Sequence, residues 1–558
     1  MPKVDIPFDS YHDYDAMTAH LQALAAAYPA LCQLTSIATS FRGRKVWMAT
    51  LTNPATGPAH EKPGFYIDAQ IHAEEHATSA TALYAIWYLL THYGADEECT
   101  RLLDSQVFYV IPRINPDGAE YSLKEPYHPW CGNGRFLPGE DRIDGLIPQD
   151  INGDGYIVNM RVPDPKGEWK KSPTEPRLMV QREPGEEGGE YYRVYPEGLI
   201  RDYDGVHVKI VPGNDGNMNR NFPINWSPQE YGAGLYPFSE PEAMGMGQVI
   251  LNHPNICGMC AYHTHGGIIL RPSMMKMDAE MSPRDLALYK DLGAVGTRIT
   301  GYPTISTYED FTPDKSKARH GSLKDWVYEE MGIICFSTEL WDLERTAGVE
   351  KTGYYNLGPR DAETQERIFQ WVLKNVGDHG FRDWEAYEHP QLGPVEIGGM
   401  VYIWSYRNPP GHLLQDICHR NTLFNLRHAA AAPRVVVDVL NVEALGADLF
   451  KVSAVVSNHG YLPTNLSDVA IQNDVAKPVT ISIVTEGAEL VMNPGQAELG
   501  HLAGRNERRY NWSPWGQQWS AVTKKVEWLV RSTGAGASVT VTAASEKGGT
   551  NRRSLPLG

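Results

Sequence analysis

The residues best suited to chemistry lie in one short stretch, from His72 to His76. Residues 64–69 before it read as a buried strand, and apolar residues after it recur at helical spacing. His72 and Glu75 therefore lie where a strand ends and a helix begins, which is where side chains reach a cleft. An imidazole and a carboxylate at this spacing can bind one divalent metal ion. The alternative is that both are polar residues that cap the helix, since short motifs often arise by chance.

A catalytic zinc site also needs a third protein ligand and a base that takes the proton of a water molecule. His263 follows an apolar strand and precedes a Gly-Gly turn, so it is our candidate for the third ligand. Glu339 ends another apolar strand and is our candidate base. A carboxylate there is costly unless it faces a metal, a cation or water. The ordinary alternatives are a structural histidine and an ion-paired glutamate.

The elements that must position these residues alternate between strands and helices, which predicts an α/β domain over residues 1–375 with a mixed sheet flanked by helices on both faces. A Pro-, Gly- and acid-rich segment at about 122–215 reads as a loop insertion. Residues 376–433 read as a connector with a short amphipathic helix. Residues 434–558 carry strands separated by turns, which predicts an antiparallel β-sandwich as an accessory domain.

Composition limits the class of protein. The chain has 558 residues, too many for one core, and a formal charge of −18, which disfavours a nucleic-acid partner. No apolar run is long enough for a membrane span. Seven scattered cysteines indicate reduced thiols, and we interpret Cys257 and Cys260 as buried structural thiols rather than a metal or redox pair. The start of the chain shows no signal peptide, which favours a cytoplasmic location, with a secreted or periplasmic one open if a leader has been removed.

Five motifs, taken together, are similar to those of the carboxypeptidase A-like zinc peptidases, family M14. In chain order they are His72-Ala73-Glu74-Glu75, Asn115-Pro116-Asp117-Gly118, Asn219-Arg220-Asn221-Phe222-Pro223, the strand of His263, and Thr338-Glu339-Leu340. The resemblance covers roughly residues 10–375. It implies that His72, Glu75 and His263 bind one Zn²⁺, which lowers the pKa of its water toward ~7 and polarises the scissile carbonyl. It also implies that Glu339 is the general base.

The resemblance further implies that Asn219 and Arg220 hold the terminal carboxylate of the substrate, a task that suits the fork of an arginine. The alternative for Arg220 is a surface ion pair. The family also uses an arginine that stabilises the oxyanion. Arg135 in the segment 130–135 best resembles it, with Arg161 as the reserve.

Some positions depart from the family pattern. Many relatives have an arginine where this chain has Glu74, and Asn217 stands where an aspartate usually orients the first zinc histidine. The tyrosine that caps the substrate has no clear counterpart, although Tyr308 lies nearby. Either Leu323 or Lys324 could face the specificity pocket.

Two other metal readings stay open. The stretch from His72 to His76 also fits H-x-x-E-H, in which both histidines bind zinc, but a strand that runs up to His72 gives the wrong geometry. Asp150, Asn152 and Asp154 resemble the start of an EF-hand calcium loop, and a structural Ca²⁺ there would pin the insertion. The twelfth position of that loop is Arg161 rather than glutamate, so a polar turn is the alternative.

We therefore expect a zinc-dependent metallocarboxypeptidase that hydrolyses C-terminal peptide bonds through a zinc-activated water and acts on peptide or protein C-termini. One alternative is an M14-like amidase or deacylase that acts on N-acyl amino acids or cell-wall peptides. The other is a non-catalytic peptide-binding relative. The sequence names no partner for the sandwich.

Overall fold

The computed structural model describes residues 3–124, 126–127, 131–135, 145–210, 216–230, 232–350, 361–506 and 522–558. Its central element is a mixed eight-stranded sheet in the order β1-β2-β4-β3-β11-β14-β12-β13. The four strands β4, β3, β11 and β14 run parallel to one another in the middle. The strands are β1 Cys32–Thr39, β2 Lys45–Leu51, β3 Gly64–Ala69, β4 Val107–Ile111, β11 Ile256–Thr264, β12 Ile268–Arg271, β13 Thr304–Ser306 and β14 Ile334–Leu340.

Helices flank this sheet, as the sequence predicts, and three of its four central parallel strands are completely buried. Every residue of β3, β4 and β11 is buried, which explains their nearly continuous apolar sequences. The helices of the domain are α1 Tyr14–Ala27, α2 His76–His92, α3 Glu97–Ser105, α4 Pro116–Leu123, α5 Pro241–Asn252, α6 Pro283–Thr300, α7 Thr307–Phe311, α8 Leu323–Glu329, α9 Leu343–Thr346 and α10 Ala362–Asn375. No helix among the described residues is long and apolar enough to cross a membrane.

The insertion and the connector share a second, six-stranded antiparallel sheet in the order β15-β16-β6-β9-β7-β8. Strand β16 pairs with β6, so residues near 397 join residues near 160. Strands β5 and β10, which come before β6 and after β9 in the sequence, form a separate two-stranded antiparallel ribbon. The strands are β5 Gly145–Pro148, β6 Asn159–Pro163, β7 Trp169–Lys171, β8 Met179–Gln181, β9 Tyr192–Pro196, β10 Gly198–Arg201, β15 Phe381–His389 and β16 Gly393–Met400.

The rest of the connector folds onto the central domain rather than linking two bodies loosely. A short π-helical turn, η7 (Ile403–Arg407), leads into α11 (Gly411–Ala430), which has 20 residues. Helix α11 packs against α2, α6 and β11. Its buried residues, such as Leu414 and Phe424, belong to the same core as the central sheet. The connector is therefore a structural part of the central domain, which its sequence pattern did not indicate.

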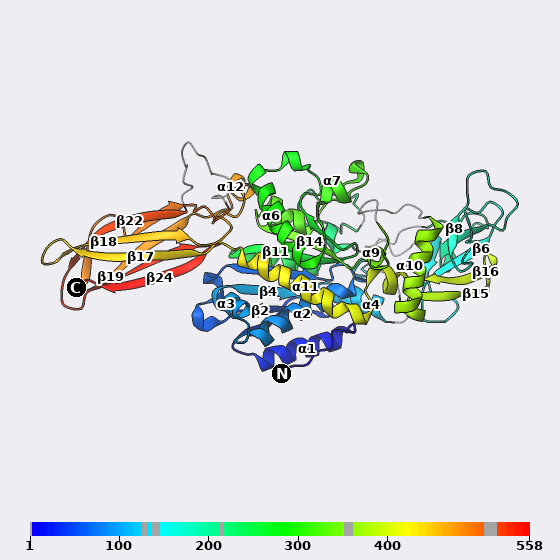
Figure 1. Ribbon diagram of the computed structural model, residues 1–558, viewed down its shortest axis with the longest axis horizontal. Coiled ribbons are helices and arrows are strands. Elements are labelled where there is room, and N and C mark those ends of the chain that lie inside the picture. The colour runs from blue at the N-terminus through cyan, green and yellow to red at the C-terminus, as the bar shows by residue number, and fades with distance from the viewer. Residues whose placement is uncertain are drawn as a thin grey trace.

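The C-terminal region forms two four-stranded antiparallel sheets around a separate apolar core. It lies at one end of the molecule and the six-stranded sheet lies at the other, with the central sheet between them (Figure 1). The sandwich strands are β17 Val435–Ala444, β18 Leu449–Asn458, β19 Val479–Glu486, β20 Ala488–Met492, β21 Gln496–Gly500, β22 Thr523–Ser532, β23 Ser538–Ser545 and β24 Gly549–Pro556.

Specific polar contacts attach the sandwich to the central domain. The buried ammonium of Lys547 donates to the carbonyl oxygens of Pro254, 2.6 Å away, and Ile256, 2.9 Å away, at the start of β11. Arg552 forms an ion pair of 2.6 Å with Glu61. Helix α12 (Asp468–Gln472) contacts α6, where Ser282 donates to Asp468 at 2.5 Å. The sandwich is thus held at the edge where the central parallel strands begin.

Candidate metal centre and active site

The predicted ligands meet at the edge of the central sheet where three adjacent parallel strands end. In the pairing of β11 with β14, His263 lies directly opposite Glu339. On the other side of β11, Tyr262 pairs with Ala69, the last residue of β3. Because the carboxyl ends of parallel strands share one edge, residues that are far apart in sequence meet there.

The loop between β3 and α2 has its own supports, which fix the positions of His72 and Glu75. Gln70 leaves the strand with a left-handed backbone (φ 55°), which turns the chain out of the sheet. Its side-chain amide donates to the carbonyl oxygen of Ala73 at 2.9 Å. The side chain of Asn115 donates to the carbonyl of Gly132, and the amide of Ala73 donates to the carbonyl of Cys131 at 3.0 Å. Glu75 then stands directly before the first turn of α2.

His72, Glu75 and His263 point their ligand atoms at one another. The Nδ1 atom of His72 lies 3.0 Å from Glu75 Oε1, and the Nδ1 atom of His263 lies 3.2 Å from Glu75 Oε2. The two Nδ1 atoms are 3.2 Å apart. Among the described residues, these three are the one group of histidine, cysteine or acidic side chains close enough to hold a metal ion.

These distances fit a tetrahedral zinc ion. Ligand atoms at about 2.0–2.1 Å from zinc are about 3.3 Å apart along each edge of the tetrahedron. The three measured separations lie close to that value. Two imidazole nitrogens that face each other with a carboxylate between them form a set that suits a divalent cation better than a network of hydrogen bonds. The residues present therefore fit the metal that the sequence predicts.

The charges support the same assignment for two of the three ligands. Burial and the neighbouring charges of His263 and Arg220 lower the pKa of His72, against the opposing effect of Glu75. Burial disfavours ionisation of Glu75, but His72 and His263 outweigh it and hold the pKa of this carboxyl well below its usual range. Glu75 is thus a carboxylate, and His72 favours its neutral form. Both are the forms that ligate metals. Burial lowers the pKa of His263, but the charge of Glu75 and its hydrogen bond outweigh burial and raise this pKa, so His263 must lose a proton when a metal binds.

Glu339 lies beside this group with the electrostatics of a base. Burial, together with the charge of Glu75, raises the pKa of Glu339 to about 7, although His263, Arg407 and Arg319 oppose the shift. A carboxyl group with a pKa near neutrality can both accept and return a proton. Its position opposite His263 places it on the same side of the sheet as the ligands.

Asn219 and Arg220 lie together in the turn η3 (Met218–Arg220). The side-chain oxygen of Asn219 accepts from the amide of Leu323 at 3.1 Å, which leaves its amide nitrogen pointing away from that contact. Arg220 donates to the carbonyl of Asn219 at 2.7 Å and lies 3.4 Å from Glu230. Arg220 is close enough to affect the pKa of His72, so the pair borders the ligand group.

Neither arginine that the sequence offered as the oxyanion donor contacts this group. Arg135 forms an ion pair of 3.1 Å with the buried Glu240. Trp130, which begins the segment that suggested Arg135, lies outside the described residues. Arg161 lies in the six-stranded sheet, where it makes two hydrogen bonds to Glu396 at 2.8 and 3.0 Å. Arg407 does reach the ligand group, since its Nη1 lies 3.8 Å from Glu75 Oε1, and nothing in the sequence indicated this because no motif surrounds Arg407.

Two further positions differ from expectation. The side-chain oxygen of Asn217, which stands where an aspartate usually orients the first zinc histidine, accepts from the amide of Asn219 at 3.0 Å in a turn contact. Lys324 is buried, and its ammonium donates to the carbonyl of Arg271 at 3.3 Å and to the hydroxyl of Thr307.

His76 has a structural environment. Its Nδ1 lies 2.8 Å from the side-chain nitrogen of Gln70, and its Nε2 lies 3.1 Å from the hydroxyl of Ser122. Its ring stacks on Trp404, with the ring centres 5.7 Å apart. Burial, with the charge of Arg113, lowers the pKa of His76 to about 3. Both ring nitrogens are used, so the H-x-x-E-H reading has no support.

The calcium site that the sequence left open in the insertion is also unsupported. Asp150 accepts from the amides of Gly153 and Gly155, at 2.7 and 2.9 Å. Asn152 accepts from the amide of Asp154 at 3.1 Å. Asp154 forms an ion pair of 3.0 Å with Arg382. The oxygens expected to bind Ca²⁺ thus shape a polar turn, and the loop needs no ion to account for them.

The seven cysteines are free thiols, and six of them are buried. Burial raises the pKa of Cys257 to about 12 and that of Cys260 still higher. Such thiols remain protonated at neutral pH, so this pair is not poised for metal or redox chemistry.

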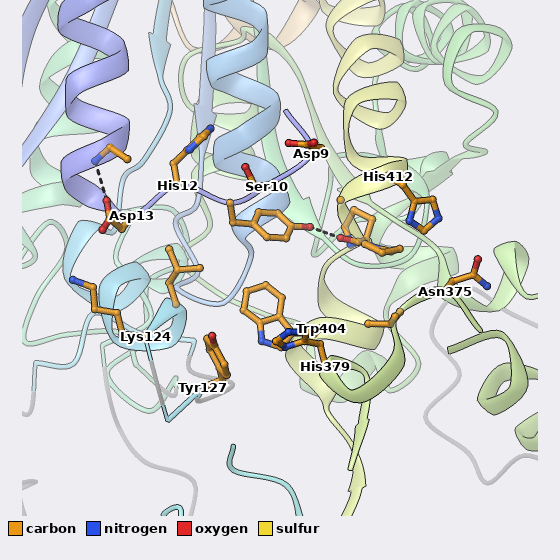
Figure 2. A pocket seen from close by; sticks show the side chains of 17 residues that line it. Asp9, Ser10, His12, Asp13, Lys124, Tyr127, Asn375, His379, Trp404 and His412 are labelled. Atoms are coloured by element: carbon orange, nitrogen blue, oxygen red, sulfur yellow. Dashed lines mark hydrogen bonds between the residues drawn. The ribbon is translucent and has the colours of Figure 1, made fainter. Parts of the chain in front are cut away.

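A pocket of about 870 Å³ lies beside the connector. Tyr11, Tyr127, Trp404 and three histidines line it, and the hydroxyl of Tyr11 donates to the carbonyl of Pro409 (Figure 2). None of His72, Glu75, His263 and Glu339 belongs to its lining. It is therefore a separate cavity.

Known proteins similar to this chain agree with the geometry. The family model described as zinc carboxypeptidase matches residues 17–356, and a model of a domain of unknown function matches residues 434–556. Carboxypeptidase D of Drosophila melanogaster is 30% identical over 409 residues, which is 70% of this chain and 23% of that protein. An inactive metallocarboxypeptidase of Saccharomyces cerevisiae is 31% identical over 118 residues, 21% of this chain and 27% of that protein.

Among solved structures, thrombin activatable fibrinolysis inhibitor aligns with 76% of this chain and 74% of its own, at 16% identity and a TM-score of 0.46. The matched part spans about a quarter of the length of the two curated relatives. The family model covers more than half of the chain and includes His72, Glu75, His263 and Glu339. The chain belongs to the zinc carboxypeptidase family, peptidase M14.

Proposed function

We propose that this protein is a metallocarboxypeptidase that removes residues from the C-termini of peptides. One observation carries the proposal: His72, Glu75 and His263 form a zinc-shaped group, and Glu339 lies beside it with a pKa raised to about 7. Because the family includes a relative described as inactive, membership alone does not imply turnover. The presence of Glu339 directly opposite His263, beside a complete set of ligands, is what favours an enzyme over a binding protein.

The proposed chemistry divides between the metal and the chain. When bound, zinc supplies Lewis acidity that polarises a carbonyl and acidifies water. Glu339 accepts the proton of the attacking water and returns it to the leaving amine. Asn219 and Arg220 hold the terminal carboxylate of the peptide, since the arginine fork matches a carboxylate and the amide nitrogen of Asn219 is a further donor.

The test is digestion of a peptide library by the zinc-loaded protein, read by mass spectrometry. We expect loss of single residues from free-acid peptides and little cleavage of the same peptides with an amidated C-terminus. Cleavage of both forms at comparable rates would favour the amidase or deacylase alternative. If the wild-type protein holds one zinc ion per chain and binds peptides but cleaves none, the result would favour the non-catalytic peptide-binding alternative.

A further inference from the structure

The connector packs directly on the loop that carries the ligands. The side-chain oxygen of Asn408 accepts from the amide of Ala77 at 2.9 Å, in the first turn of α2. Its side-chain nitrogen donates to the carbonyl of Glu74 at 2.8 Å, and the residue is fully buried. Four residues earlier, Trp404 stacks on His76 and faces the neighbouring pocket (Figure 2). Residues 402–410 therefore pack along one side of the loop from His72 to His76.

Arg407 extends from residues 402–410 to the ligand group. Its Nε lies 2.7 Å from Glu74 Oε1, and its Nη1 donates to the carbonyl of Thr264, the last residue of β11, at 2.6 Å. The same Nη1 lies 3.8 Å from Glu75 Oε1. The guanidinium is thus clamped between the loop and the strand that supply the three ligands.

The clamp does not enclose the whole side chain. Arg407 keeps 24% of its side-chain surface exposed, whereas Glu74 and Glu75 keep 5% and 3%. Nη2 makes no hydrogen bond or ion pair with the described residues, while the guanidinium as a whole lies over the ring of Tyr402, 5.5 Å from its centre. An arginine carries five N–H donors in a rigid plane, so one edge can be anchored while another faces a ligand. Here the anchored edge faces Glu74.

The positive charge of Arg407 at this position indicates what could bind beside it. A permanent cation beside a group that binds a divalent cation is unfavourable, because like charges at such distances repel. Glu74 offsets part of this repulsion. The rest is relieved when negative charge develops between the two cations, as it does on a carbonyl oxygen under attack by water.

We propose that Arg407 is a catalytic residue that donates hydrogen bonds to the oxygen of the scissile carbonyl, and that Glu74 holds it in place. This inference rests on the proposed peptidase function. As the water oxygen bonds to the carbonyl carbon, the π electrons of the carbonyl move to its oxygen, and Glu339 receives the proton. Arg407 transfers no proton and stabilises the charge that forms.

The proposal also explains two departures of the sequence. Glu74 stands where the resemblance leads us to expect an arginine, and its carboxylate anchors a guanidinium from the connector. Arg407 lies beyond residue 356, where the match to the family model ends. The connector thus supplies a residue that Arg135 and Arg161, engaged with Glu240 and Glu396, do not.

The decisive variant is Arg407→Met, compared with Arg420→Met. Arg420 is a matched control because it also joins a carboxylate, Asp416 at 2.7 Å, to a backbone carbonyl, that of Thr300 at 2.7 Å, on the same connector. We expect kcat/KM of Arg407→Met on a free-acid peptide to fall about 100- to 1,000-fold, with zinc content unchanged. Arg420→Met should stay close to wild type.

A second measurement separates a catalytic role from a structural one. A phosphinic peptide imitates the tetrahedral, negatively charged transition state, and its Kd for Arg407→Met, measured by calorimetry, should rise by a similar factor. The Kd of a product amino acid should change little. Equal weakening of both ligands, or wild-type kcat/KM with normal zinc content, would overturn the proposal.

If Arg407→Met does not fold, Arg407→Lys decides. It keeps the charge and the anchor but loses the fork, so we expect at least a tenfold loss of kcat/KM with zinc retained. Wild-type activity in that variant would refute the role of Arg407. An inactive wild type with full zinc would instead refute the peptidase function.

Discussion

Two regions of the molecule carry residues of the metal-binding type, and they differ in what already occupies their ligand atoms. At the strand edge, the ligand atoms of His72, Glu75 and His263 face one another. In the insertion, the oxygens of Asp150, Asn152 and Asp154 accept from the amides of their own loop or pair with Arg382. Residue type and spacing were suggestive in both. The backbone amides within reach decide between them, because a loop whose amides satisfy its carboxylates gains its order without an ion.

The strongest way to break this comparison is His263→Ala. Loss of one of three ligands should reduce zinc to well below one per chain and peptidase activity to background, because a two-ligand site binds zinc weakly. Metal content by mass spectrometry and the peptide assay measure both. The matched control is His76→Ala, in the same stretch, which should keep its zinc. Zinc loss in that control would revive the H-x-x-E-H reading.

Glu339→Gln separates the metal from the chemistry. We expect kcat to fall by about 100- to 10,000-fold, because an amide cannot accept the proton of the attacking water. Zinc content should not change. A variant that keeps more than a tenth of wild-type turnover would show that another group is the base.

The pH profile should report the same carboxyl group. Only ionised Glu339 accepts a proton, so kcat/KM should fall as the pH drops through its pKa. In the metal-free protein burial raises that pKa to about 7, and a bound divalent cation favours the carboxylate and lowers it. The acid limb of the zinc-loaded enzyme should therefore lie below about pH 7. A profile of kcat/KM in wild type that stays flat from about pH 4 to 8 would contradict this assignment.

The smallest effect belongs to the insertion. Asp154→Asn keeps an oxygen for the amide of Tyr156 but removes the ion pair with Arg382, which is partly exposed. We expect a loss of about 1 kcal/mol at most in the free energy of unfolding and no change in metal content. Thermal denaturation with and without Ca²⁺ measures this. Stabilisation by Ca²⁺ that disappears in the variant would restore the calcium site.

The comparison also shows what the sequence can reveal. His72, Glu75, His263 and Glu339 could be proposed as one site because each lies at or soon after the end of an apolar strand, and because the order of the motifs resembles that of the M14 peptidases. Arg407 could not be predicted in this way. It lies in a short helical turn without a motif, and it reaches Glu74 only because α11 packs across α2.

The same limit applies to the fold. The alternation of strands and helices indicated the central sheet, and the valine-rich runs indicated the sandwich. The six-stranded sheet was hidden because β16 pairs with β6 across more than two hundred residues. Local sequence does not show which distant strand a segment pairs with, and the segment at about 122–215 is rich in Pro, Gly and acidic residues and shows little periodicity.

The attachment of the sandwich has a consequence for how the enzyme would reach a tethered substrate. Lys547 contacts β11 at Ile256, while His263 lies seven residues further along the same strand, about 23 Å away at ~3.3 Å per residue. A surface held by the sandwich near this attachment would lie behind the catalytic edge. A peptide tail that grows from that surface must then be at least about seven extended residues long to bring its end around to the metal.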